Sequence, residues 1–316
     1  MKYLYGIDVG GTTSKIGFFN LNGVLLEKFM IPTDTSNNGA NILDNIIHSI
    51  NSHIESKHLN KDSIFGIGIG VPGPVVNGVV YGCVNLGWGT TNVLEYLENR
   101  LGLKVSVGND ANMAGLGEMW QGSGRIYSNL VFITIGTGVG GAIIIDNKIV
   151  EGSTGASGEI GHIETLDNYF KCHCGKTGCL ETVSSATGIV NVAHKLMQEK
   201  RIDSRLYMYH NLNAEIIFTE AKKNDPLALE VVDIFGKNLA YVCAAIGVIT
   251  NPEAFIIGGG VANTGSIVIS YIQKYFKEFA FPNIINNTEF KLAKLGNDAG
   301  IFGAAYLAKR EGGLCV

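Results

Sequence analysis

Charged residues are scarce in this chain. They make up 16% of its 316 residues, well below the ~25% of an average globular protein, while apolar residues reach 46%. Disordered chains and coiled coils need the opposite balance, so both classes are excluded. No long basic run is present, and 24 Lys and Arg against 28 Asp and Glu leave a formal net charge of −4. We therefore expect no nucleic-acid partner.

Long hydrophobic runs are also missing. The N-terminus has only a few apolar residues before Gly6, which is too few for a secretory signal. The longest apolar run, from Leu239 to Ile249, has eleven residues, fewer than the ~20 that cross a bilayer. These absences predict a cytoplasmic protein with no membrane partner. At roughly 150 residues per domain, the length predicts about two domains.

Glycine is abundant, with 42 residues in no collagen-like period, which predicts many tight turns and close backbone approaches. Hydrophobic periodicity and turn signals predict a mixed α/β sheet in the first third of the chain. The expected strands are 3–9, 15–19, 24–29, 64–71 and 104–107. The expected helices are 42–54 and 93–101, with a further helix beginning after Asn109-Asp110.

A similar pattern recurs further along the chain. The expected strand 131–135 leads into the glycine loop 136–141 and then into strand 142–145. Gly10 precedes the turn at Asn20 by ten residues, and Gly136 precedes the turn at Asp146 by ten. Two related halves explain this better than a chance similarity of two hairpins. The remaining expected elements are a helix from Pro226 to about 248, a strand 255–257 and a terminal helix 299–309.

Three glycine-rich loops, 10–11, 136–141 and 258–260, each follow a predicted strand. The second matches the dinucleotide-binding pattern G-x-G-x-x-G, but that site needs a helix directly after the glycines, and the β-branched run Ile143-Ile144-Ile145 follows instead. No P-loop pattern occurs. A single glycine hairpin could be purely structural. Three such loops favour a polyphosphate ligand held by backbone N–H groups.

Half of the six cysteines fall within eight residues. Cys172, Cys174 and Cys179 together with His162 could supply three sulfurs and one nitrogen, a donor set typical of structural zinc. The alternatives are a disulfide or three free thiols. A disulfide is disfavoured in a cytoplasmic chain and leaves one thiol of the trio over. His173 could replace His162 as the nitrogen ligand, although we expect it to point away.

Two aspartates have settings that suggest chemistry. Asp110 follows Asn109 at an expected helix start, where capping is the simpler explanation for either residue. Asp8 lies inside the apolar strand Ile7-Asp8-Val9, where a charge needs a cation or hydrogen-bond donors. Because a glycine loop follows it directly, we expect Asp8 to be a magnesium partner.

Six short motifs occur together in one order, and together they resemble the ROK family (repressors, open reading frames and sugar kinases), most closely its glucokinases. The resemblance spans essentially the whole chain, and the last two motifs are the most specific. The motifs are Asp8-Val9-Gly10-Gly11-Thr12, Gly70-Val71-Pro72-Gly73-Pro74, Asn109-Asp110-Ala111-Asn112, Gly136-Thr137-Gly138-Val139-Gly140-Gly141, Gly158-Glu159-Ile160-Gly161-His162 and Cys172-His173-Cys174-Gly175 through Gly178-Cys179-Leu180-Glu181.

The resemblance implies ATP-dependent phosphorylation of glucose at its 6-hydroxyl. Asp110 would be the general base, and Asp8 would hold Mg²⁺ through water. The residues that would bind the sugar are Gly73, Asn109, Asp110, Glu159, His162 and Glu181. The nucleotide would be held by Gly10, Gly11, Thr12, Gly136, Thr137 and Gly138, with Gly258, Gly259 and Gly260 beside adenosine. Zinc on His162, Cys172, Cys174 and Cys179 would be structural, aligning the sugar-binding side chains.

The resemblance also implies an α/β fold of two actin-like (ribonuclease H-like) ATPase domains around a central cleft. The smaller domain would be 1–109 plus a returning helix 300–316, and the larger one 110–299 with the zinc loop. A homo-oligomer, dimer or tetramer, is expected.

Rival functions share most of these motifs. Kinases for N-acetylmannosamine, fructose, mannose or allose are one group, although N-acetylmannosamine kinases commonly have an arginine where Pro74 stands, and Ser157 stands where many glucokinases have alanine. A repressor would need a helix-turn-helix before the first strand, for which we expect no room. A non-catalytic sugar-binding protein would be expected to lack Asp110. Polyphosphate remains an alternative phosphoryl donor.

Overall fold

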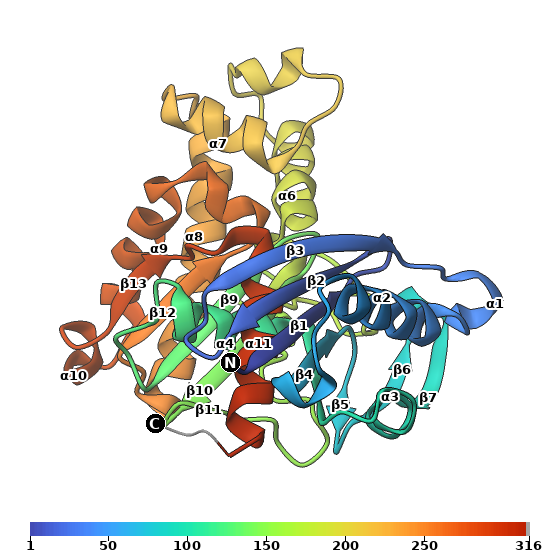
Figure 1. Ribbon diagram of the computed structural model, residues 1–316. Coiled ribbons are helices and arrows are strands. Elements are labelled where there is room, and N and C mark those ends of the chain that lie inside the picture. The colour runs from blue at the N-terminus through green and yellow to red at the C-terminus, as the bar shows by residue number, and fades with distance from the viewer. Residues whose placement is uncertain (314–316) are drawn as a thin grey trace. The chain divides into compact units, whose positions relative to one another are not determined.

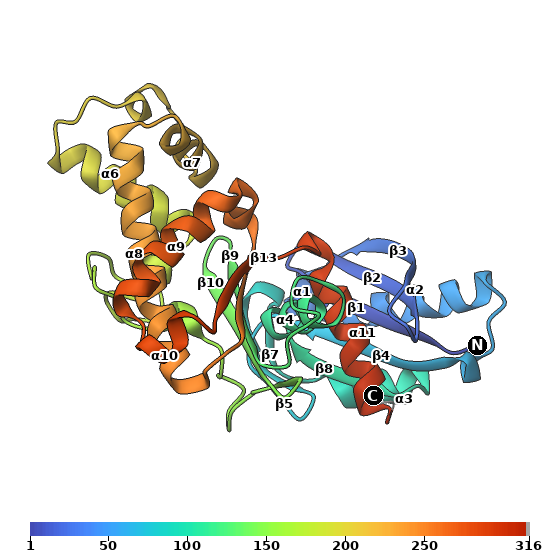
Figure 2. The ribbon, with the colours of Figure 1, turned by 90° about the vertical axis from the view of Figure 1, so that its left-hand side faces the viewer.

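The computed structural model describes residues 1–313, which fall into two compact units (Figures 1 and 2). Unit 1 contains residues 1–125, 149–157 and the chain from 297 onward, and unit 2 contains 126–148 and 158–296. Unit 1 therefore extends past the expected boundary at 109. The reason is that helix α4 (Asp110–Gln121) packs along helix α11 (Ala299–Glu311) of the same unit. The returning helix expected at 300–316 ends at Glu311, and positions 314–316 lie outside the described residues.

Unit 1 is built on a five-stranded sheet with the order β3-β2-β1-β4-β8. The first three strands form antiparallel pairs, whereas β1–β4 and β4–β8 are parallel. Strand β4, which lies between β1 and β8, is buried along nearly its whole length, as expected for a strand covered on both faces, while the edge strand β3 alternates between half-buried and exposed residues. The strands are β1 (Tyr3–Val9), β2 (Thr13–Asn20), β3 (Leu25–Pro32), β4 (Ile64–Val71) and β8 (Val105–Asn109).

Helices cover both faces of this sheet (Figure 1). Helices α2 (Ile42–Ser56) and α3 (Val93–Leu101) bury their apolar stripes against one face, and α11 packs on the other. The sequence places glycine where α11 lies closest. A Cβ at Gly68 would stand 1.7 Å from the carbonyl oxygen of Ala304, and one at Gly6 would stand 1.9 Å from that of Ile301. The high glycine content thus allows a helix backbone to pack directly on the sheet.

Short elements complete unit 1. A three-stranded sheet of order β5-β6-β7 follows β4, and its strands are β5 (Val75–Val76), β6 (Val79–Cys83) and β7 (Trp88–Asn92). A four-residue helix, α1 (Ser36–Gly39), precedes α2. The single-turn 3-10 helices of this unit are η1 (Lys61–Ser63), η2 (Val84–Leu86) and η6 (Gly296–Asp298), the last at the junction with unit 2.

Unit 2 repeats the same sheet plan, with the order β11-β10-β9-β12-β13. Here too the first hairpin, β9–β10, is antiparallel, and β12 is parallel to both β9 and β13. The matching orders confirm the predicted repeat of the strand–glycine loop–strand plan. The strands are β9 (Leu130–Ile135), β10 (Val139–Ile145), β11 (Lys148–Ile149), β12 (Ala254–Gly258) and β13 (Glu289–Leu292).

Helices pack on one face of this second sheet (Figure 2) and share one large core with it. The helices are α5 (Glu181–Ser184), α6 (Ala186–Glu199), α7 (Ala214–Lys222), α8 (Pro226–Thr250), α9 (Ser266–Phe279) and α10 (Pro282–Ile285). The 3-10 helices are η3 (Ile160–His162), η4 (Arg205–Met208) and η5 (Gly260–Thr264).

The longest apolar run expected from the sequence lies inside α8. This helix has 25 residues and is, by length and composition alone, apolar enough to cross a membrane. In the structure 61% of its most apolar window is buried, because Leu239, Val242 and Cys243 contribute to the core of unit 2. The composition of α8 is thus explained by its position in the interior of that unit.

Candidate functional site

The candidate site residues of unit 1 gather at one edge of its sheet. The register pairs Asp8 of β1 with Gly70 of β4, and Val71 of β4 with Asn109 of β8. Because these strands are parallel, the segments that follow them emerge at the same edge. Those segments are the glycine loop 10–12, the Pro-Gly-Pro turn with Gly73, and the start of α4 at Asp110.

Asn109 fastens two of these segments together. Its side-chain oxygen caps α4 by accepting hydrogen bonds from the backbone N–H groups of Ala111 at 3.0 Å and Asn112 at 3.2 Å. Its Nδ2 donates to the carbonyl oxygen of Gly73 at 3.1 Å. Gly73 has φ +98°, which favours glycine. Asn109 therefore caps α4 and holds Gly73 at the same time, and because an amide carries two N–H donors, one more is available for a ligand.

Asp110 is the first residue of α4 and is half-buried. Its Oδ1 accepts a hydrogen bond from the N–H of Ala111 at 2.8 Å. Burial raises the pKa of the nearby Cys83 thiol, and the negative charge of Asp110 adds to that effect. The carboxylate therefore lies close to the end of β6, held by a helix N-terminus, a position that suits an anion.

Asp8 has a partner that the sequence analysis missed. Its Oδ2 lies 3.2 Å from Nζ of Lys15, directly across the β1–β2 hairpin. The side chains of Asp8 and Lys15 are 21% and 26% exposed. The charge inside the strand is thus compensated by a lysine. The signal was available, since a residue seven positions on in a tight hairpin returns to face the first strand.

The two glycine loops of unit 2 also share a sheet edge. Residues 136–138 connect β9 to β10 as a hairpin, closed by a hydrogen bond from the N–H of Gly136 to the carbonyl of Gly138 at 3.0 Å. No helix follows this loop directly, so the dinucleotide fingerprint is excluded. Gly259 has φ +83°, and a Cβ there would stand 2.5 Å from the backbone of Ile135. The loop 258–260 therefore lies against the end of β9.

The first turn of α6 is a further part of this edge that the sequence analysis missed. The N–H of Ala186 donates to the carbonyl of Gly136 at 2.8 Å. A pocket of about 270 Å³ lies here, lined by residues that include Thr137, Gly138, Glu181 and Thr187. Only a contact between distant segments reveals this, so the sequence pattern could not predict it.

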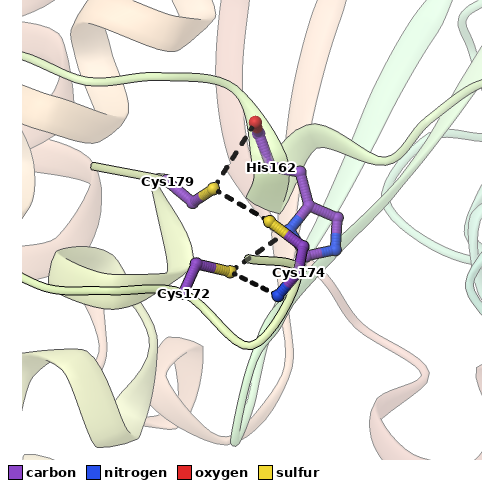
Figure 3. A group of neighbouring side chains, drawn as sticks. All are labelled: His162, Cys172, Cys174 and Cys179. Carbon is purple, nitrogen blue, oxygen red and sulfur yellow. Dashed lines mark hydrogen bonds between the residues drawn. The ribbon is translucent and has the colours of Figure 1, made fainter. Parts of the chain in front are cut away.

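The predicted zinc ligands do come together, on η3 and the loop that follows (Figure 3). The four ligand atoms of His162, Cys172, Cys174 and Cys179 all lie within 4.8 Å of one another. Sγ of Cys174 is 3.6 Å from Sγ of Cys179, and Sγ of Cys172 is 3.6 Å from Nδ1 of His162. A tetrahedral zinc with Zn–S bonds of ~2.3 Å places its sulfurs ~3.8 Å apart. The donor set and its spacing therefore fit zinc.

The thiol chemistry of the group fits the same interpretation. Burial, and then the Glu181 carboxylate that accepts the Cys172 Sγ–H at 3.0 Å, raise the pKa of Cys172 to about 12. A bound cation would instead favour the deprotonated form of the cysteines, because thiolates are the species that bind metals. His173 is not a member of the group and instead lines the pocket beside Gly138.

Glu159, His162 and Glu181, expected to bind sugar hydroxyls, lie around this group. Nε2 of His162 is 3.9 Å from Oε2 of Glu159, and Nδ1 of His162 is 3.8 Å from Oε1 of Glu181. Glu181 also reaches the glycine loop, since a Cβ at Gly138 would stand 2.9 Å from Oε2 of Glu181. The three side chains therefore form one polar cluster between the cysteine loop and the glycine loop of unit 2.

Comparison with known proteins places this arrangement in a family. The model of the ROK family matches residues 4–311. A glucokinase from Halalkalibacterium halodurans is 40% identical over 98% of this chain and 96% of its own length. A solved ROK family glucokinase from Streptomyces griseus, in complex with glucose and AMPPNP, is 29% identical and superposes with a TM-score of 0.75, covering 98% of this chain and 99% of that one.

Other relatives carry a different name. A xylose repressor from Caldicellulosiruptor bescii is 28% identical over 95% of this chain and 76% of its own length. The predicted α/β fold of two actin-like (ribonuclease H-like) halves is confirmed by the two matching sheets and by the solved relative.

Proposed function

This chain belongs to the ROK family, and from that premise we propose that it is a glucokinase, which transfers the γ-phosphoryl group of ATP to the 6-hydroxyl of glucose. The observation that carries the proposal is the setting of Asp110. Its carboxylate stands at the N-terminus of α4, beside an asparagine that ties the helix start to Gly73. The 40% sequence identity to a glucokinase over 98% of this chain supports the choice of reaction.

Asp110 is the general base in this proposal. The carboxylate accepts the proton of the 6-hydroxyl as the oxygen attacks phosphorus, a contribution of ~10²–10⁴-fold to the rate. Asn109 and the backbone of Gly73 orient the sugar next to it. The hydrogen bonds that Asn109 makes to both segments fix its amide before the sugar arrives, which reduces the entropy cost of orientation.

The nucleotide is held by Gly10, Gly11, Thr12, Gly136, Thr137 and Gly138, with Gly258, Gly259 and Gly260 beside adenosine. Phosphoryl transfer asks the protein mainly for positioning and charge neutralisation, which N–H-rich loops supply. Asp8 offers a carboxylate at the same edge as loop 10–12 and would hold Mg²⁺ through water. Bound Mg²⁺ neutralises charge on the phosphoryl oxygens.

Zinc is structural in this proposal, held by His162, Cys172, Cys174 and Cys179 as a closed set of four ligands. Bound zinc would fix the orientation of the His162 ring. Nε2 of His162 then donates to a sugar hydroxyl, and Glu159 and Glu181 accept from others. Carboxylates aimed at hydroxyls discriminate strongly, because an analogue that lacks the hydroxyl leaves them unpaired.

A substrate panel tests the proposal. With ATP and Mg²⁺, glucose should give the highest kcat/KM among glucose, mannose, fructose, allose and N-acetylmannosamine. If fructose or N-acetylmannosamine exceeds glucose tenfold, the glucokinase assignment fails while a sugar-kinase function stands. No turnover with any sugar, combined with sugar-dependent DNA binding, would favour the regulator named among the relatives. Polyphosphate in place of ATP tests the phosphoryl donor.

We further propose a cytoplasmic homo-oligomer, a dimer or tetramer, that binds neither nucleic acid nor membrane. Light scattering on the eluting protein gives the assembly mass directly. A monomer at all concentrations, or sedimentation with lipid vesicles, would contradict this part of the proposal.

A further inference from the structure

Among the described residues, Lys15 is the one cationic side chain paired with Asp8, which lies on β1 just before the first glycine loop. Strands β1 and β2 run antiparallel with Asp8 opposite Lys15. Nζ of Lys15 lies 3.2 Å from Oδ2 of Asp8 and donates to the backbone carbonyl of Asn297 at 2.8 Å. The side chains of Lys15 and Asp8 are 26% and 21% exposed, so both are largely buried. The ammonium group is therefore at the strand ends from which loop 10–12 emerges.

The packing around Asp8 leaves its carboxylate little freedom. A Cβ at Gly300 would stand 2.8 Å from Cγ of Asp8, so the carboxylate lies against the first turn of α11 and only a glycine fits there. The lysine, in contrast, has a flexible four-carbon stem and three donors. When charges at this edge change, Lys15 is the partner that can move.

Nucleotide binding changes those charges. A divalent cation held near Asp8 repels the ammonium 3.2 Å from the same carboxylate. The phosphates that arrive with it attract the ammonium and offer it charge-assisted hydrogen bonds. The lowest-energy arrangement leaves Asp8 to the metal's water shell and brings Lys15 to a phosphoryl oxygen.

We propose that Lys15 is a nucleotide-binding residue, which neutralises Asp8 while the site is free of nucleotide and donates to a phosphoryl oxygen when Mg–nucleotide binds. The proposal rests on the proposed kinase function. It adds a cationic side chain to a phosphate site otherwise built from backbone N–H groups and Thr12. The competing explanation is that the Lys15 contacts only tie the β1–β2 hairpin to the segment before α11.

The chain offers a matched control for that explanation. Lys28 of β3 pairs with Asp298, one residue beyond the carbonyl that Lys15 reaches, with Nζ–Oδ distances of 2.9 and 2.8 Å. It ties the same sheet to the same segment but does not contact Asp8. Lys28→Met therefore removes a comparable tie without removing the charge next to the glycine loop.

Titration calorimetry with Mg–AMPPNP and steady-state kinetics test the proposal on the full chain. Lys15→Met should weaken Mg–AMPPNP binding about tenfold or more and raise KM for ATP, with KM for glucose unchanged. Lys15→Arg, which keeps the charge, should recover much of the affinity. Lys28→Met should bind like the wild type. Nucleotide affinity in folded Lys15→Met equal to that of the wild type would overturn the proposal.

A measurement on the wild-type protein covers the case in which Lys15→Met does not fold. Acetylation of individual lysines, followed by mass spectrometry, should show Lys15 protected by Mg–AMPPNP and Lys28 unaffected. Equal labelling of Lys15 with and without nucleotide would overturn the proposal. A wild type that binds no nucleotide would overturn the kinase function as well, which separates the two failures.

Discussion

Nδ1 of His162 lies 3.6 Å from Sγ of Cys172, inside the group of four candidate metal-ligand atoms. The other ring nitrogen, Nε2, faces outward and lies 3.9 Å from Oε2 of Glu159. A metal on Nδ1 fixes the proton on Nε2, which makes this atom a hydrogen-bond donor of set direction. In the proposed sugar site, a zinc ion on Nδ1 would therefore set the direction in which Nε2 of His162 donates to a hydroxyl.

The first prediction concerns this metal. Purified protein should contain about one zinc per chain, and Cys174→Ser should lose it together with thermal stability, because folding and metal binding are coupled. Metal analysis and thermal unfolding measure both. Cys243→Ala is the control, since Cys243 is buried in the core of unit 2 and outside the metal-ligand group. Zinc-free protein with full activity would refute the structural role.

Asp110→Asn tests the general base. Asparagine keeps the shape, the ability to begin a helix and an oxygen that accepts from the N–H of Ala111, but it cannot take a proton. We expect kcat to fall ~10²–10⁴-fold with thermal stability nearly unchanged. A folded variant that retains more than about a tenth of the wild-type kcat is incompatible with general-base catalysis by this residue.

Gly68→Ala tests the close packing of α11 on the sheet. The new methyl group would meet the carbonyl of Ala304 at 1.7 Å, so either the helix or the strand must shift. Overpacking of this kind costs ~1–3 kcal/mol or more, measurable by urea unfolding. Gly89→Ala is the control, because nothing lies within 4 Å of the position of its Cβ. Equal stability of the two variants would show that α11 packs differently.

Acid sensitivity should depend on Glu220. Hydrogen bonds from Lys223, Arg205 and Tyr209 lower the pKa of this carboxyl from 4.5 to about 2. In the unfolded chain Glu220 takes up its proton first as the pH falls. Its contribution to stability is therefore complete above about pH 4.5 and is lost between about pH 4.5 and 2.

Glu220→Gln should lower stability at neutral pH and flatten the loss of stability over that acid range. Urea unfolding at a series of pH values measures the effect, with Glu215→Gln, on the exposed face of the same helix, as the control. The same acid slope in wild type and Glu220→Gln would mean that other carboxyls dominate.

The sequence pattern located the main elements of both sheets well. The expected strands 3–9 and 64–71 and the helix 93–101 coincide with β1, β4 and α3. Such segments are set by local periodicity and by glycine and asparagine at their ends. Helices α6, α7 and α9 were not predicted, although the signal was present in α9, where the buried residues Val268, Ile272, Tyr275 and Phe276 recur at helical spacing.

The sequence by itself determined the two-fold repeat, the positions of the glycine loops, the grouping of three cysteines with a histidine as candidate zinc ligands, and the place of Asp110 at a helix start. These follow from residue types at short spacings along the chain. Only the tertiary structure decided which nitrogen of His162 joins the cysteines, and that the first turn of α6 lies on loop 136–138. Side-chain direction and contacts between distant segments are fixed by packing, which no short stretch of sequence encodes.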